Sequence, residues 1–155
     1  MALLATATTE GNRNLTASST KSMFEILGTT GTNAKLVEFG ISFNGVTSTD
    51  APIMVELYQI TATGTGTTVT PRAVQRTGGT PVCTTKALDT VEPTKTNRMA
   101  VWYVHPQGGN LVIQYPLGRE PVISDASASQ GLAWVLTPGT LTATTGCVMY
   151  LFWEE

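Results

Sequence analysis

Charge, cysteine and histidine are all scarce in this chain of 155 residues. Asp, Glu, Lys and Arg make up 13% of it, compared with about 25% in an average soluble domain. The formal net charge is −2 and the nine Lys and Arg residues form no run, so we expect no nucleic-acid partner. No apolar stretch approaches the roughly 20 residues of a membrane span, and we expect no membrane partner.

The scarcity of titratable side chains also argues against an enzyme. His105 is the single histidine, and it lies in a Pro-Gly loop without the partners that a hydrolase triad or a zinc site requires. Glu120 and Asp125 have the residue type of a paired-carboxylate glycosidase site, but beside Pro121 we interpret them as surface charges. We therefore predict no catalytic residue, no metal and no cofactor.

The two cysteines, Cys83 and Cys147, are too few for a disulfide framework. Both have apolar neighbours, which favours two buried thiols, and a single disulfide between them is the alternative.

Threonine replaces the missing charge, with 28 residues, and its β-branched side chain suits a pleated surface. Val37, Phe39, Ile41 and Phe43 are apolar at every second position, which predicts a strand with one buried face. Further strand candidates are short apolar runs bounded by Gly, Pro, Asn or Thr, at residues 22–27, 53–60, 99–104, 111–115, 132–136 and 146–153. We expect an exposed loop or a flexible hairpin tip at 61–71 and one helical turn at 86–91.

Some eight short strands, turn signals every 8–15 residues and almost no helical periodicity predict an all-β fold. We expect a jelly-roll-type β-sandwich over residues 22–155, preceded by an extended N-terminal arm at 1–21. The arm is too polar to bury much apolar area by itself, so we expect it to lie across a neighbouring subunit. The residues assigned to this contact are Leu3, Leu4, Asn12, Arg13 and Leu15.

Two strand candidates, residues 99–104 and 147–153, are apolar on both faces. A strand of this kind needs a second cover besides its own core, and a partner subunit can supply it. We therefore expect a homo-oligomer whose subunit interface includes Trp102, Tyr103, His105, Met149, Leu151 and Trp153.

Several segments together resemble a group of small all-β virion proteins of tailed bacteriophages and prophages: EFGISFNG, APIMVELYQ, WYVHPQGG, QYPLGREPV and the terminal LFWEE. The resemblance covers most of the chain from about Glu38. It implies a capsid decoration (cement) protein with a jelly-roll fold, which binds the major capsid protein as a trimer and stabilises the head. It also implies the capsid surface as the alternative contact for the N-terminal arm. The expected location is the outer surface of the virion, after synthesis in the host cytoplasm.

A second interpretation is a jelly-roll adhesin or head-fibre module that holds host glycans on its aromatic side chains. The positions of the tryptophans distinguish the two: burial favours decoration, whereas exposure in a groove favours glycan binding.

Overall fold

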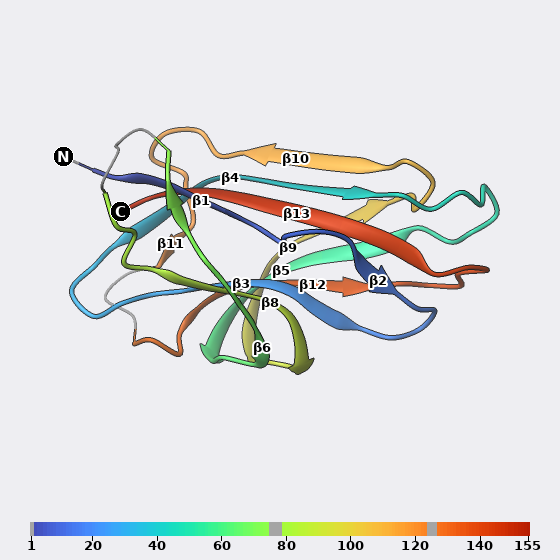
Figure 1. The fold of residues 1–155 in the computed structure, drawn as a ribbon, viewed down its shortest axis with the longest axis horizontal. Helices are drawn as coiled ribbons and strands as arrows, with labels where there is room; N and C mark the ends of the chain where they lie inside the picture. Colours follow the sequence, from blue (N-terminus) through green and yellow to red (C-terminus); the bar gives the residue numbers. More distant parts are fainter. Residues whose placement is uncertain (1, 75–78, 124–126) are drawn as a thin grey trace.

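The fold is an all-β sandwich of two antiparallel sheets, seen in a computed structural model that describes residues 2–74, 79–123 and 127–155 (Figure 1). The described residues contain no helix, and so none long and apolar enough to cross a membrane. Sheet A contains β1 (Leu4–Thr8), β2 (Arg13–Leu15), β4 (Ala34–Phe43), β7 (Arg72–Ala73), β10 (Asn110–Gln114), β11 (Val122–Ile123) and β13 (Thr145–Glu154). Sheet B contains β3 (Lys21–Leu27), β5 (Ile53–Ala62), β6 (Thr65–Val69), β8 (Thr84–Val91), β9 (Thr94–Val104) and β12 (Gly131–Thr137).

The strand order is that of a jelly roll, as the sequence predicts. β1 and β2 together form the first strand of the motif, and β3, β4, β5, β9, β10, β12 and β13 follow as strands two to eight. Sheet A has the order first, eighth, third, sixth, and sheet B has the order second, seventh, fourth, fifth. Apart from the fourth and fifth strands, the neighbouring strands of this motif are not consecutive in sequence, which is the signature of two interlocked Greek keys.

The N-terminal segment is extended, but it belongs to the sandwich and does not form a separate arm. β1 pairs with β13 from Leu4↔Glu154 to Thr8↔Tyr150, and β2 pairs with β13 at Leu15↔Thr145. Leu15 is completely buried in the core. The prediction of a separate arm from the polar composition was wrong. A strand inside a sheet pairs its backbone N–H and C=O groups with its neighbours, so it needs few large apolar side chains.

Aromatic side chains fill the space between the sheets. The ring centroids of Phe39 and Trp134 lie 5.4 Å apart, and Trp102 meets Phe39 edge-on at the same distance. Phe39 comes from sheet A and the two tryptophans come from sheet B, so these contacts join the layers. Aromatic contacts of this kind stabilise the core beyond the effect of the apolar area that the rings bury.

One long ribbon of paired strands includes residues 65–69 and 84–91, where the sequence predicts a loop or hairpin tip and a helical turn. Only Thr63 and Gly64 separate β5 from β6, and only Glu92 and Pro93 separate β8 from β9. The β5–β6 segment pairs with the β8–β9 segment on both sides of these short connections, at Ala62↔Thr94 and at Thr65↔Val91. Because the β5–β9 half lies at one edge of sheet B and the β6–β8 half at the other, the ribbon bends sharply between them (Figure 1).

We predict that Leu15→Ala lowers the free energy of unfolding by about 2–5 kcal/mol, since it leaves a cavity in the core. Urea denaturation measures the change. The control is Leu117→Ala, at a side chain that is 90% exposed, where we expect less than about 0.5 kcal/mol. Equal effects of the two substitutions would contradict the placement of β2 in the core.

Candidate functional site

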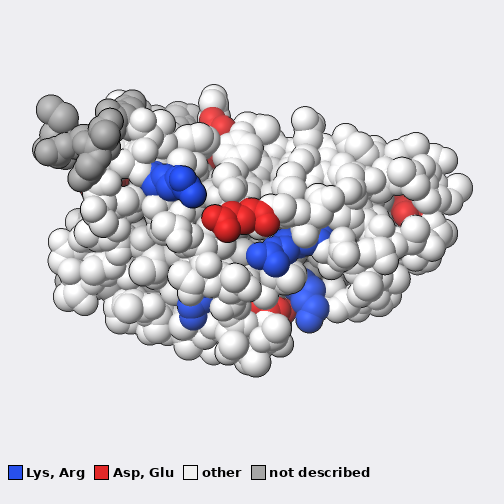
Figure 2. Space-filling model, viewed as in Figure 1, with Lys and Arg blue, Asp and Glu red and all other residues white. Residues whose placement is uncertain are grey.

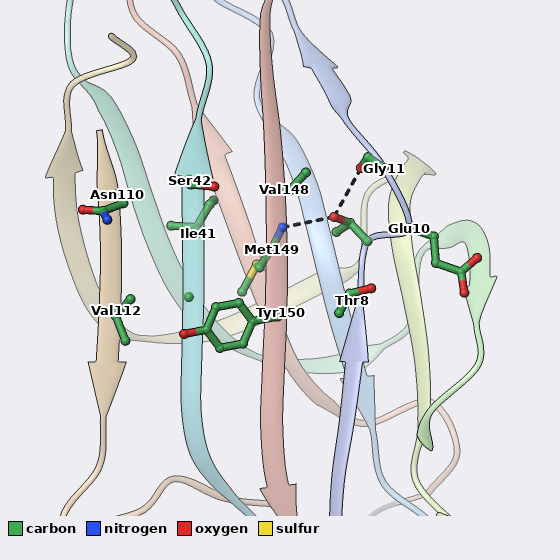
Figure 3. Close-up of a pocket in the computed structure, with 12 residues that line it drawn as sticks. Thr8, Glu10, Gly11, Ile41, Ser42, Asn110, Val112, Val148, Met149 and Tyr150 are labelled. Carbon is green, nitrogen blue, oxygen red and sulfur yellow. Dashed lines mark hydrogen bonds between the residues drawn. The ribbon is translucent and has the colours of Figure 1, made fainter. Parts of the chain in front are cut away.

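A shallow hollow of about 320 Å³ lies on the outer face of sheet A. Its floor comes from β4 and β13, and its sides come from β10 and from the turn between β1 and β2 (Figure 3). Apolar groups of Val112, Val148 and Tyr150 line it together with the polar side chains of Ser42 and Asn110. The sequence analysis did not predict this feature.

Gly40 explains how the hollow forms. A Cβ atom at this position would lie 2.2 Å from the Tyr150 ring, so the ring occupies space that a side chain would take. The Tyr150 hydroxyl donates a hydrogen bond of 2.7 Å to Glu38 Oε1. This hydrogen bond, burial and the negative charge of Glu38 raise the pKa of Tyr150 to about 12. The isolated glycine within the alternating EFGISF run was the available signal, since such glycines often mark a close approach.

The turn between β1 and β2 fixes the rim of the hollow. Thr9 is buried, and its hydroxyl accepts a hydrogen bond of 3.0 Å from the backbone N–H of Met149. Glu10 and Gly11 follow with φ angles of 41° and 98°, so the chain turns in the left-handed region. The Glu10 carboxylate points away from Tyr150 and the hollow (Figure 3).

The residues that line this hollow offer apolar and hydrogen-bonding contacts to another molecule, but they do not form a catalytic set. Its titratable side chains are Glu10, which points outward, and Tyr150, which is engaged with Glu38. Across the described residues no group of three or more His, Cys, Asp or Glu side chains could hold a metal ion.

His105 and Glu120, which the sequence singled out, are not among the residues that line the hollow. His105 follows β9, and its Nδ1 accepts a hydrogen bond of 3.1 Å from the backbone N–H of Gln107, as expected of a residue that fixes a turn. Glu120 accepts a hydrogen bond of 2.7 Å from the backbone N–H of Gly118. Asp125 lies outside the described residues.

Three of the predicted interface residues are unavailable to a neighbouring subunit. Met149, Leu151 and Trp153 are at most 2% exposed, because this face of β13 packs into the chain's own core. Trp102 packs partly on the core, whereas Tyr103 is 70% exposed on the opposite face of β9. The alternation along β13 revealed two apolar faces but did not reveal which of them packs into the chain's own core; on the other face Val148 is 38% exposed.

The five residues assigned to the arm contact have separate environments. Leu15 is in the core, and Leu3, Leu4 and Arg13 are half-buried beside β13 and its C-terminal end. Asn12 is exposed in the turn that precedes β2. The structure therefore does not bring these residues together as one outward-facing surface.

The tryptophans do not form an exposed platform for sugars. Trp134 and Trp153 have no exposed surface, and Trp102 is half-buried against Phe39. Glycan binding by stacked tryptophans requires their exposure in a groove, and these tryptophans are not exposed in that way.

Comparison with known proteins does not place this chain in a family. No family model and no curated protein matches this sequence. A solved structure of the T13 IBDV viral particle aligns with 99% of this chain at 14% identity, with a TM-score of 0.29. The alignment spans 39% of that chain, and a likeness of this degree carries no argument about fold or function.

We predict that Gly40→Ala destabilises the protein by about 1–3 kcal/mol, because the new methyl group displaces the Tyr150 ring. Denaturant unfolding measures the loss. In a Tyr150→Ala background the same substitution should cost much less, since the clashing ring is gone. An unchanged cost in that background would show that the ring is not what the methyl group meets.

Cys83 and Cys147 are free thiols, and each is about 1% exposed. Burial is the main cause that raises the pKa of both thiols to about 12. We predict that neither reacts with a thiol-specific reagent at pH 8 until the protein unfolds, since the thiolate is the nucleophile. A Val46→Cys variant, at a side chain that is 81% exposed, should react at once. Rapid labelling of the native wild-type protein would contradict this prediction.

Proposed function

We propose that the chain is a bacteriophage capsid decoration protein. It assembles as a homotrimer, binds the major capsid protein on the outer surface of the virion and stabilises the head. The jelly-roll topology and the resemblance of the WYVHPQGG and QYPLGREPV segments to phage virion proteins support this proposal.

The observation that carries the proposal is the exposed apolar face of β9. Met99 and Val101 are each 42% exposed and Tyr103 is 70% exposed, all at alternating positions of one strand. Within the described part of the chain, β9 pairs with β5 on one side and with no strand on the other. A long edge strand with an apolar face is a site for association with another protein chain.

The distribution of charge agrees with a surface that meets protein. Figure 2 shows a face that is largely free of charged side chains, with Lys, Arg, Asp and Glu residues scattered singly or in small groups. Charged residues are depleted where protein interfaces have a buried centre, because the charge would lose its hydration.

We assign β9 to the contact between subunits and the outer face of sheet A to the capsid protein. Val112 and Val148 border the hollow on that face and are 52% and 38% exposed. The N-terminal segment is committed to the sheet of its own chain, so the proposal does not use it as an anchor.

We predict that the purified protein has three times the 16.4 kDa mass of one chain in light scattering at micromolar concentration. Val101→Glu should give monomers, because it places a charge on the apolar face of β9. Val46→Glu adds the same charge at a loop residue that is 81% exposed and should leave the trimer intact. A monomeric wild-type protein would refute the trimer.

Decoration requires a separate measurement. Particles of the phage that encodes this chain should lack a surface density when its gene is deleted, and the purified protein should restore that density in electron cryomicroscopy. Val101→Glu should restore it weakly, since a monomer loses the avidity of three linked contacts. If the deleted particles keep the full outer surface, the chain is not a decoration protein, whatever its oligomeric state.

A further inference from the structure

Two carboxyl groups are buried at the bend of the β5–β6 and β8–β9 ribbon. Glu25 on β3 has no exposed surface, and Asp89 on β8 is 2% exposed. Buried carboxylates are rare in proteins unless a cation or hydrogen-bond donors compensate their charge. Neither residue takes part in the hollow or in the exposed face of β9.

Both carboxyl oxygens of Glu25 accept hydrogen bonds from the residues of the bend. Thr63 Oγ1 donates a hydrogen bond of 2.6 Å to its Oε2, and the backbone N–H of Gly64 donates one of 3.0 Å to its Oε1. Lys86 Nζ lies in the same network, because it donates to Thr63 Oγ1 at 2.8 Å and to the Gly64 carbonyl at 3.0 Å. These contacts connect β3 and β8 to the two residues at which the ribbon bends.

Asp89 has no comparable donors. Neither of its buried carboxyl oxygens receives a hydrogen bond from the described residues. It packs tightly against the glycines of the bend, since a Cβ atom on Gly66 would lie 2.2 Å from its Oδ1. Gly64 brings the two carboxyl groups together, since its backbone N–H donates to Glu25 Oε1 and a Cβ atom on it would lie 2.8 Å from Asp89 Oδ2. A proton on Asp89 itself supplies the missing hydrogen.

The surrounding charges favour this protonated form. Burial raises the pKa of Asp89 to about 8, with further contributions from Glu25 and Glu92, while Lys86 lowers it. Glu92 is held apart by its own hydrogen bonds from the backbone N–H and hydroxyl of Ser22. The turn at 63–64 and strand β6 contribute no charged side chain.

We propose that a proton shared by Asp89 and Glu25 holds the ribbon bend closed, and that loss of this proton to solvent loosens the bend. In the closed state the proton lets one carboxyl group donate to the other. Without it, two buried negative charges face each other across the junction of β3 and β8, and hydration of Asp89 requires the bend to open.

The direction of the pH dependence follows from the raised pKa of Asp89. In the open state a hydrated Asp has a pKa of about 4, so between about pH 4 and 8 the closed state binds one proton more than the open state. The equilibrium constant for closure of the bend therefore falls as the pH rises through this window, by up to about tenfold per pH unit. Above about pH 8 it becomes constant.

Hydrogen exchange on the full-length protein from pH 5 to pH 9 tests the proposal, with rates expressed relative to an unstructured peptide at the same pH. The amides of Gly64 and of residues 65–69 should lose protection by up to about tenfold per unit until about pH 8. Core amides of β13 should not follow this profile. In parallel, the chemical shift of the Asp89 carboxyl carbon should titrate near pH 8.

Asp89→Asn is the decisive variant, because its amide donates to Glu25 at every pH and mimics the protonated acid. Protection of the bend should then be high and independent of pH. Glu10→Gln removes one exposed charge elsewhere and should retain the wild-type profile. An Asp89 carboxyl that titrates near pH 4, or an Asp89→Asn variant that keeps the wild-type pH dependence, would overturn the proposal.

Discussion

The sandwich depends on the pairing of β13 with strands from both ends of the chain. β13 bonds to β4 on one side and to β1 and β2 on the other, so it joins the N-terminal segment to the rest of sheet A. Its alternating side chains reach the core through Met149, Leu151 and Trp153. Without this strand, Leu15 would lose the backbone pairing that holds it in the core.

The same arrangement determines which surfaces remain for other molecules. The inward face of β13 is used within the monomer, whereas the outward face of β9 keeps Met99, Val101 and Tyr103 accessible. Two strands with similar two-faced apolar patterns therefore have different roles. β13 lies inside sheet A and has a neighbour on each side, while β9 ends sheet B and has one.

Buried polar groups occur where the ribbon must bend, and this too reflects the topology. The ribbon turns at Thr63–Gly64 and places Glu25 beneath it, where the backbone N–H of Gly64 compensates the charge. Asp89 receives no such compensation from the described residues. The bend, which crosses from one edge of the sheet to the other, therefore packs closely at Gly66. It also carries the electrostatic cost of burying Asp89, which depends on the proton that Asp89 shares with Glu25.

The sequence by itself determined the all-β class and the positions of most long strands, because alternation and turn residues act locally. It favoured a jelly roll, but the order of the strands came from the tertiary structure. It also indicated two thiols with apolar neighbours at Cys83 and Cys147. Only the tertiary structure decided that residues 4–15 complete the chain's own sheet and that β6 continues β5. The physical reason is that strand pairing is non-local: a pattern shows that a strand has two faces and two edges, but the neighbours that cover them come from distant parts of the chain.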